Sequence, residues 1–327
     1  MGIGIIGVGI GLPTKVVKNK DLEKISEVTS EWIVKKIGVK ERRICTKDEA
    51  LSDLVLKAST MALEKSQIKP EEIDLLIVAA HNHDYLIPQT ATIVQNKLGA
   101  KNAIAFDIRG GCAGSIYAII TAINYIKADF CKNALIIGGE VHSKMVDWSD
   151  YRNSVFFADG AGAVVIGEVP DGYGFLSGFL GTYERDTNAL IVEAGGSREP
   201  ITKEAIDAKR HYLKMDGKKI WEFATTVFPL SIRKVAKKAN IQIKDIDFVI
   251  PHQTNVNIIK VSMEKLGLSM KKTSYETLER YGNSAAGTVI IELSNAIKRG
   301  SIKRGNLVAL TAFGAGLSFG ALLFKWY

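Results

Sequence analysis

The sequence predicts an α/β protein built from two similar halves, and three observations support this prediction. Apolar runs of strand length alternate with longer helical patterns along all 327 residues, which is the pattern of strands connected by helices. One strand–helix segment recurs in the second half. Glycines gather at the ends of apolar runs, where backbone can approach a ligand or pack tightly. We expect the central strands to be mainly parallel.

The composition is that of an ordinary globular protein. Hydrophobic residues make up 46% of the chain and charged residues 24%, which excludes disordered, collagen-like and coiled-coil proteins. No apolar run approaches the roughly 18 to 20 residues of a membrane span, and the N-terminus lacks the basic segment of a signal peptide. We therefore expect a cytoplasmic protein that does not associate with membranes.

The formal net charge is +8, from 43 Lys and Arg against 35 Asp and Glu. This excess fits an anionic partner, such as nucleotide phosphates, an acidic protein or nucleic acid, and fits a lysine-rich surface equally well. The three cysteines are too few and too widely spaced for a disulfide framework or a zinc site. Each cysteine therefore needs its own interpretation.

Strands in the first half are predicted where short aliphatic runs end in polar or glycine residues, and helices where apolar residues recur every three to four positions. The strands are Gly4–Ile10, Ile73–Ala79, Ala103–Ile108, Ala134–Gly138 and Ala163–Glu168, and the helices are Ser52–Ser66, Thr90–Leu98 and Ala113–Lys127.

The same two patterns continue in the second half. The predicted strands are Gly174–Phe179, Phe248–Pro251, Val308–Ala312 and Ala321–Phe324, and the predicted helices are Ile220–Ala239, Val256–Leu266 and Ser284–Lys298.

An internal repeat supports the division into two halves. The segment that starts at Ile68 (IKPEEIDLLIV) resembles the one that starts at Ile241 (IQIKDIDFVI), and each is followed by a helix that ends in Lys-Leu-Gly. The repeat is much longer than a solenoid unit, so we predict two packed halves, 1–170 and 171–327, with a site between them.

Cys112 is the strongest candidate for a catalytic residue. The string Gly110-Gly111-Cys112-Ala113-Gly114 ends a predicted strand and opens an apolar helix. A thiol at a helix N-terminus faces the positive end of the helix dipole, which favours the thiolate. The small residues let an acyl group approach and leave backbone N–H donors free. Cys45 and Cys131 lack this setting, and we interpret them as structural.

His252 and Asn283 are candidate partners of this cysteine. His252 follows a predicted strand at its carboxyl end, where sites of α/β proteins form, and Asn283 lies in a polar turn that opens a helix. The glycine-rich stretch Phe313–Gly320 can supply N–H groups of the kind that an oxyanion hole uses. Papain-like proteases share the order Cys, His, Asn, but their signature around the nucleophile is absent here.

Two weaker signals carry no function in our interpretation. Gly7–Gly11 resembles a dinucleotide-binding fingerprint, but Pro13 follows where the phosphate-binding helix should begin. His81 and His83 could suggest a metal, but no further ligands follow at a useful spacing. We interpret this pair as part of a polar loop.

Several motifs, taken together, resemble the β-ketoacyl-acyl carrier protein synthase III family of thiolase-fold condensing enzymes, over essentially the whole chain. The motifs are Ser30-Glu-Trp-Ile-Val, Gly38-Val-Lys-Glu-Arg, Cys112-Ala-Gly, Asp159-Gly-Ala-Gly-Ala, His252-Gln-Thr-Asn, Tyr281-Gly-Asn-Ser-Ala-Ala and the C-terminal glycine-rich strand.

The resemblance implies a thiolase-like, five-layered αβαβα fold of two pseudo-repeated halves, and a homodimer. It implies that the enzyme acts in fatty acid or related biosynthesis on acyl-CoA and malonyl-acyl carrier protein. No metal or redox cofactor is implied, because the chemistry needs only the two thioester substrates. The implied catalytic residues are Cys112, His252 and Asn283.

The resemblance also implies roles for residues around the nucleophile. The oxyanion hole would use the N–H groups of Cys112 and Ala315, and Ile87 would close the acyl pocket of the partner subunit. The residues implied in CoA binding are Trp32, Lys36, Arg152, Gly217 and Asn255.

Some positions depart from the family pattern. Arg109-Gly110-Gly111 replaces a small apolar run, Ile87 stands where a Phe is frequent, and Lys36 where an Arg is common. Two other functions also stay open. One is a specialised thiolase-fold acyltransferase that moves an acyl group to an O, N or S nucleophile. The other is a nucleic-acid binder, suggested only by charge, although no basic stripe with interleaved aromatics is present.

Overall fold

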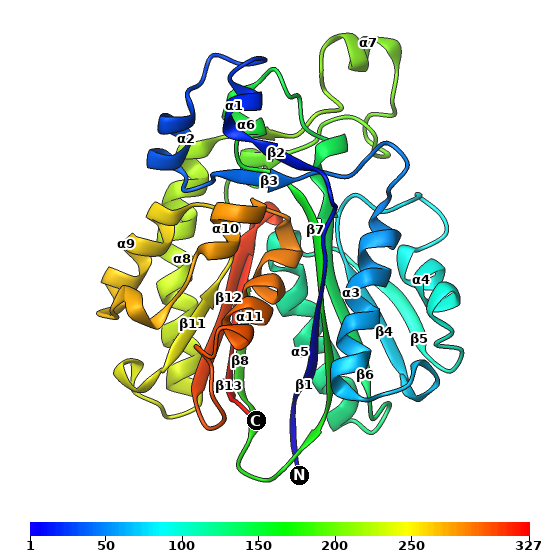
Figure 1. Ribbon diagram of the computed structural model, residues 1–327, viewed down its shortest axis with the longest axis vertical. Coiled ribbons are helices and arrows are strands. Elements are labelled where there is room, and N and C mark those ends of the chain that lie inside the picture. The colour runs from blue at the N-terminus through cyan, green and yellow to red at the C-terminus, as the bar shows by residue number, and fades with distance from the viewer.

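The computed structural model describes all residues, 1–327, and places them around two β-sheets (Figure 1). The first sheet has five strands in the order β1-β7-β6-β4-β5. Their bounds are β1 Gly2–Gly11, β4 Leu75–Ala79, β5 Ile104–Ile108, β6 Ala134–Val141 and β7 Asp159–Val169.

The second sheet repeats this arrangement with the order β11-β12-β13-β8. Thr273 forms an isolated parallel bridge with Val249 of β11, at the place that β5 takes beside β4 in the first sheet. The bounds of its strands are β8 Gly174–Thr182, β11 Phe248–Pro251, β12 Leu307–Gly314 and β13 Ser318–Lys325. The matching orders support the predicted pseudo-repeat, while the boundary near residue 170 stays a prediction.

Helices form the other three layers. Helices α5 (Gly114–Lys127) and α11 (Thr288–Lys298) contact strands of both sheets and lie between them. Helices α3 (Leu51–Ser66) and α4 (Thr90–Leu98) cover the outer face of the first sheet, and α8 (Gly217–Lys238) covers the outer face of the second, with α9 (Val256–Leu266) packed against it. The result is the five-layered αβαβα arrangement that the resemblance implied (Figure 1).

The expectation of mainly parallel central strands holds for strand direction, but both sheets are mixed, because one strand in each, β7 and β13, runs opposite to all the others. Strands β4, β5 and β6 are parallel to each other, as are β11 and β12, but β1, β7, β8 and β13 pair antiparallel with their neighbours. The connection from β12 to β13 consists of only Ala315–Leu317. Parallel neighbours need a crossover of a dozen or more residues, so this short turn requires an antiparallel pair.

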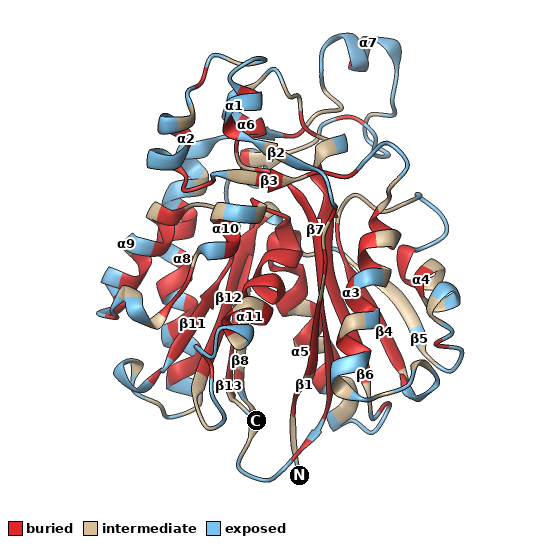
Figure 2. Ribbon diagram, viewed as in Figure 1, coloured by how far each residue is buried: buried red, intermediate tan, exposed pale blue.

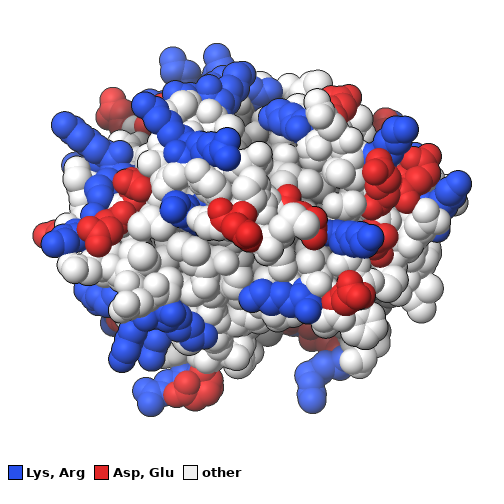
Figure 3. All heavy atoms as spheres, turned by 90° about the horizontal axis from the view of Figure 1, so that it is seen from below, with Lys and Arg blue, Asp and Glu red and all other residues white.

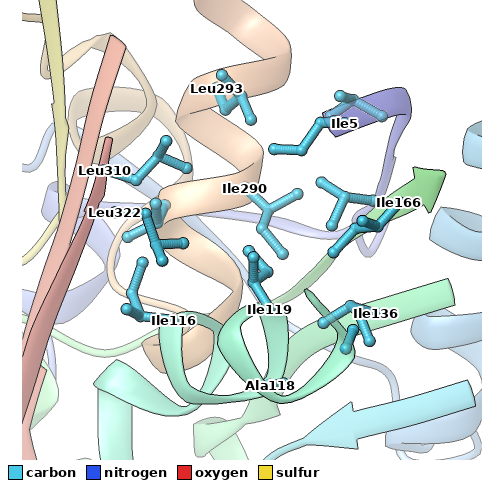
Figure 4. Close-up of a cluster of buried hydrophobic side chains, with 14 of the residues drawn as sticks. Ile5, Ile116, Ala118, Ile119, Ile136, Ile166, Ile290, Leu293, Leu310 and Leu322 are labelled. Carbon is cyan, nitrogen blue, oxygen red and sulfur yellow. The ribbon is translucent and has the colours of Figure 1, made fainter. Parts of the chain in front are cut away.

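The largest core cluster has 29 buried residues and contains side chains from both halves. Figure 4 shows Ile116 and Ile119 of α5 close to Ile290 of α11, with strand residues of the two sheets around them. Figure 2 shows the same pattern, with buried residues concentrated in the strands and in the two central helices. The two halves therefore share one core, which fixes their strand ends relative to each other.

The remaining elements are short and were not predicted from the sequence. Most of them lie at the upper end of the molecule in Figure 1, beyond the carboxyl ends of the central parallel strands. They are β2 Val16–Lys18, α1 Asn19–Leu22, α2 Ser30–Lys36, β3 Glu41–Arg43, α6 Tyr151–Ser154, β9 Leu190–Ile191, α7 Lys203–Asp207, β10 Lys214–Met215 and α10 Glu276–Tyr281.

Neither the helices nor the visible charges point to a membrane-spanning segment or to an extended basic surface. No helix is both long and apolar enough to cross a bilayer. On the face seen from below, which holds both termini, positive and negative side chains are interspersed (Figure 3).

Candidate active site

Cys112 lies in a tight turn between β5 and α5. The turn is the short 3₁₀ segment Gly111–Ala113, and Gly111 has a φ of 61°, a left-handed conformation that favours glycine. The glycine turn after β12 meets it. A Cβ on Gly314 would lie 2.9 Å from Cys112 Sγ, and a Cβ on Gly111 would lie 2.5 Å from the Ala315 oxygen. Only glycine fits at these two points, one from each half.

The thiol of Cys112 is surrounded by groups with opposite effects on its charge. Burial and the nearby Glu140 carboxylate raise the pKa of Cys112 to about 12, although the backbone N–H groups of Cys112 and Ala315 act in the other direction. The expectation that the helix N-terminus favours the thiolate is therefore wrong here, because desolvation outweighs it. At neutral pH the site holds a protonated thiol.

Glu140 is a site residue that the sequence analysis missed. It lies in β6, is almost fully buried, and its carboxylate accepts hydrogen bonds from His81 N at 3.0 Å and Asn82 N at 2.8 Å. Burial raises the pKa of Glu140 to about 7, and these backbone hydrogen bonds limit the rise. The carboxylate thus fixes the loop after β4 and places a titratable group near the thiol.

His252 follows β11, as the sequence predicts, and is held from two sides. Its backbone N–H donates to the Thr311 oxygen at 2.8 Å, and its Nδ1 lies 2.6 Å from Thr288 Oγ1. Burial lowers the pKa of His252 to about 3, with a smaller effect from His142. The imidazole is therefore neutral at pH 7 and can accept a proton or donate a hydrogen bond.

Asn283 lies just before the 3₁₀ turn that precedes α11, and it reaches the loop that follows His252. Its Oδ1 accepts a hydrogen bond from Ala285 N at 2.9 Å, and its Nδ2 donates to Thr254 Oγ1 at 3.2 Å. An amide NH₂ carries two hydrogens. One hydrogen of Asn283 Nδ2 is therefore left for a ligand, while the orientation of the side chain is fixed.

A cavity of about 340 Å³ opens onto Cys112. Ala285 and Ala315 line it next to the cysteine, which places the turns of Asn283 and β12 at the same cavity. One wall comes from the first sheet, and the other comes from the segments around β9 and residues 194–196. The lining residues are His81, Leu86, Arg109, Gly111, Cys112, Glu140, His142, Met145, Leu190, Ile191, Val192, Ala194, Gly195, Gly196, Leu213, Ala285 and Ala315.

The structure corrects the interpretation of the two loop histidines and locates Ile87. His81 lines the cavity with Cys112, so it is more than part of a polar loop, whereas His83 Nδ1 lies 3.0 Å from the Asp107 carboxylate. Ile87 does not line the cavity of its own chain, and its side chain is 89% exposed. A role for Ile87 in an acyl pocket therefore requires a second subunit.

The five candidate CoA residues lie in three places at the upper end of the molecule. The Trp32 ring packs edge-on against Tyr151 at 5.9 Å, and the neighbouring Arg152 is held by Asp150 at 2.8 Å. The Lys36 oxygen accepts a hydrogen bond from Asn257, in the first turn of the helix that Asn255 caps. Gly217 opens α8, next to Asp216, whose N–H donates to the Ala189 oxygen beside the cavity.

The family models and the curated relatives that match this chain describe the same kind of protein. A family model described as 3-oxoacyl-[acyl-carrier-protein] synthase III matches residues 106–184, and a model of its C-terminal part matches residues 236–326. A curated β-ketoacyl-[acyl-carrier-protein] synthase III from Caldanaerobacter subterraneus is 42% identical over 99% of this chain and 97% of its own length. The chain belongs to the β-ketoacyl-[acyl-carrier-protein] synthase III family.

Solved structures of the family have the same fold. The synthase III of Aquifex aeolicus has a TM-score of 0.91 and 37% identity, and covers 99% of this chain and 100% of its own. That of Thermus thermophilus has a TM-score of 0.92 and 34% identity, with 99% of both chains covered. The resemblance stated from the motifs and the thiolase-like fold are both confirmed, and the protein is a condensing enzyme by family.

The site contains no cluster that suggests a metal. No three His, Cys, Asp or Glu side chains anywhere in the chain are arranged to hold an ion. All three cysteines are buried and unpaired.

The influence of Glu140 on Cys112 predicts a change in thiol reactivity. Glu140→Gln removes a negative charge that raises the pKa of Cys112, so more thiolate should be present at any pH above about 7, where the carboxylate is ionised. We expect iodoacetamide to alkylate Cys112 severalfold faster in this variant between about pH 7 and 9. Peptide mass spectrometry gives the rate of alkylation of Cys112. Glu64→Gln, at an exposed position of α3, is the control. Equal pH profiles for the variant and the wild type would contradict the coupling.

Proposed function

We propose that this chain condenses an acyl-CoA primer with a malonyl thioester on acyl carrier protein, giving a 3-oxoacyl thioester for fatty acid or related biosynthesis. One observation carries the proposal. A buried cysteine with two N–H groups directed at its sulfur lines a cavity together with Ala285. The N–H of Ala285 holds the Asn283 side chain, and its oxygen accepts from Thr288, the hydrogen-bond partner of a neutral His252. The relatives named for this reaction match the whole chain.

In the first half-reaction, Cys112 Sγ attacks the carbonyl carbon of the acyl-CoA. A new C–S bond forms, the bond to the CoA sulfur breaks, and the thiol proton passes through His252 to the leaving CoA thiolate. The high pKa of Cys112 means that this proton must be accepted as the bond forms. The N–H groups of Cys112 and Ala315 hold the oxyanion, a role that backbone donors fulfil without reorganisation.

In the second half-reaction, a malonyl thioester loses CO₂ and leaves an enolate. Hydrogen bonds from His252 and from the free hydrogen of Asn283 Nδ2 stabilise the enolate oxygen. Its carbon attacks the acyl carbonyl carbon on Cys112, and the C–S bond to Cys112 breaks as the 3-oxoacyl thioester leaves. The thiolate of Cys112 then takes up a proton from water. This step needs a hydrogen on Nε2 of His252, whereas the first step needs a lone pair there.

The Thr288 hydroxyl can support both states of His252. Its oxygen lies 2.6 Å from His252 Nδ1 and 3.0 Å from the Ala285 oxygen. When the hydroxyl donates to Ala285, it accepts the Nδ1 hydrogen and leaves a lone pair on Nε2. When it donates to Nδ1, the hydrogen is on Nε2. Thr288 is therefore a positioning residue for the histidine.

The CoA moiety would enter from the upper end of the molecule. Trp32 and Arg152 offer an aromatic face and a guanidinium for the adenine, and Lys36 offers a cation for the phosphates. Arg152 must first leave Asp150 or carry it along, because both carboxylate oxygens now hold its guanidinium. Gly217 and Asn255 complete this proposed path. We assign no metal or redox cofactor to the reaction, because none of these steps needs one.

A homodimer would form at the open edge of the first sheet. Strand β5 is the edge strand, and Ile104 on it is 50% exposed. Leu86 and Ile87, in the loop after β4, are each 89% exposed. Unpaired edge strands and clustered apolar side chains are typical of subunit contacts. Ile87 would then reach the acyl pocket of the partner. Unpaired cysteines and CoA substrates fit a cytoplasmic location.

The nucleophile assignment makes a direct prediction. Mixing the protein with an acyl-CoA before any malonyl thioester is added should attach one acyl group to Cys112. Cys112→Ser should abolish this product, because an unactivated hydroxyl is a much weaker nucleophile. Intact-protein and peptide mass spectrometry measure it, with Cys131→Ser as the matched control. An acyl group on Cys45 or Cys131 would contradict the assignment.

The two half-reactions should separate in variants of the other two residues. His252→Ala and Asn283→Ala should lower CO₂ release from malonyl-acyl carrier protein by about 10² to 10³, the usual cost of losing one oxyanion donor. Acylation of Cys112 should survive better in Asn283→Ala than in His252→Ala, since only His252 moves a proton in that step. Asn102→Ala on the surface is the control. Acylation without any CO₂ release by the wild type would favour the alternative, acyl transfer to another nucleophile.

A further inference from the structure

The cavity contains a cation with no counter-ion. Arg109 follows β5, three residues before the nucleophile, and lines the cavity together with Cys112. Its guanidinium forms no ion pair and no hydrogen bond with any residue of this chain, and the residue is exposed. Nothing in the fold therefore holds the charge away from the cavity.

The carboxylates near Arg109 already have other partners. Asp107, two residues earlier, accepts hydrogen bonds from Thr90 N at 2.9 Å and Ala91 N at 2.8 Å, and lies 3.0 Å from His83. Glu140 is occupied by the N–H groups of His81 and Asn82. The free positive charge at this wall of the cavity is thus available to a ligand.

The chemistry of the wall favours an anionic group with two oxygens. A guanidinium is always charged and presents a planar fork of donors that matches a carboxylate. Burial lowers the pKa of the His81 imidazole, and the positive charge of nearby Arg109 lowers it further. A neutral imidazole beside the arginine adds a hydrogen-bonding group without a competing negative charge.

The two walls of the cavity indicate on which side CoA would bind and in which direction an acyl chain on Cys112 would extend. His81, Leu86, Arg109 and Glu140 follow or belong to strands of the first sheet, whereas Leu190 to Gly196 and Leu213 form the opposite wall, near the proposed CoA path. Cys112 lies between the two walls. An acyl chain attached to Cys112 would therefore extend toward Arg109 when CoA occupies the other side.

We propose that the preferred primer carries a carboxylate at the far end of a short acyl chain, and that Arg109 binds this carboxylate. This inference rests on the proposed function and deepens it by naming the substrate class. Three residues of backbone span at most about 11 Å, so only a few carbons separate the thioester from the guanidinium.

The covalent chemistry is unchanged by the extra carboxylate. Cys112 Sγ forms the thioester bond, CoA leaves with the thiol proton, and the terminal carboxylate stays ionised and bound to Arg109. The condensation then gives a 3-oxoacyl thioester with a carboxylate at its far end. Such a product needs a following enzyme that accepts an ω-carboxyacyl chain.

The test compares primers of equal shape that differ in charge. Succinyl-CoA and isocaproyl-CoA differ by a carboxylate in place of an isopropyl group, as do glutaryl-CoA and isoheptanoyl-CoA. The dimeric wild-type enzyme should form the acyl-enzyme from the charged member of a pair with a kcat/KM about ten to a hundred times higher, the range expected for a charge-assisted hydrogen-bonded pair. Salt should reduce this preference.

Variants of Arg109 connect the preference to this residue. Arg109→Gln should lower the ratio of charged to uncharged primer by about tenfold or more, and Arg109→Lys should restore part of it, because lysine keeps the charge but not the fork. Lys101→Gln removes the same charge at the other end of β5 and should leave the ratio at the wild-type value.

The outcomes separate this inference from the proposed function. Acylation by isocaproyl-CoA but not by succinyl-CoA would overturn the anionic primer and leave the condensing reaction intact. An equal ratio in wild type and Arg109→Gln would overturn the role of Arg109. If no acyl-CoA of either kind modifies Cys112, the proposed function itself fails.

Discussion

The contact between two glycine turns is the constraint on which the site depends. Gly111 precedes Cys112 in the first half, and Gly314 ends β12 in the second, so each half supplies one turn. A Cβ at either glycine would collide with the facing turn. The Ser318 hydroxyl donates to the Gly110 oxygen at 2.6 Å and ties the turns together. With the turns held together, the backbone N–H groups of Cys112 and Ala315 both act on the sulfur of Cys112.

Burial sets the protonation states that the chemistry starts from. It raises the pKa of Cys112 and lowers that of His252, so both side chains are neutral at pH 7. A neutral pair avoids the cost of burying two charges. In the proposed reaction the thiolate therefore forms only as the thioester reacts, with His252 accepting the proton. Glu140 adds to this effect by disfavouring the thiolate.

The sequence predicts the long elements and the three central residues because their signals are local. Strand β11 and helices α4 and α9 have the predicted bounds, since aliphatic runs and a C-terminal Lys-Leu-Gly mark them. His252 directly follows β11, and Cys112 lies in the short glycine turn between β5 and α5, so position along the chain is enough to find them. The short elements at the upper end have too few residues to show a period.

The other site residues depend on pairing that no local pattern reveals. Glu140 reaches the loop of His81 because β6 lies beside β4 in the sheet, with Ala79 opposite Gly138. His81 therefore looks like part of a loop in the sequence but lines the cavity in the fold. The reversed direction of β13 follows from a three-residue turn, which the alternation of strands and helices does not reveal.

Gly314→Ala tests the central claim, that the two glycine turns must touch for Cys112 to react. The measurement is the rate of acyl-enzyme formation from an acyl-CoA by quenched-flow mass spectrometry, with the melting temperature as a check on folding. We predict a folded protein whose acylation is at least about 10²-fold slower, the usual cost of displacing an oxyanion donor. Acylation at the wild-type rate by a folded Gly314→Ala would contradict the account.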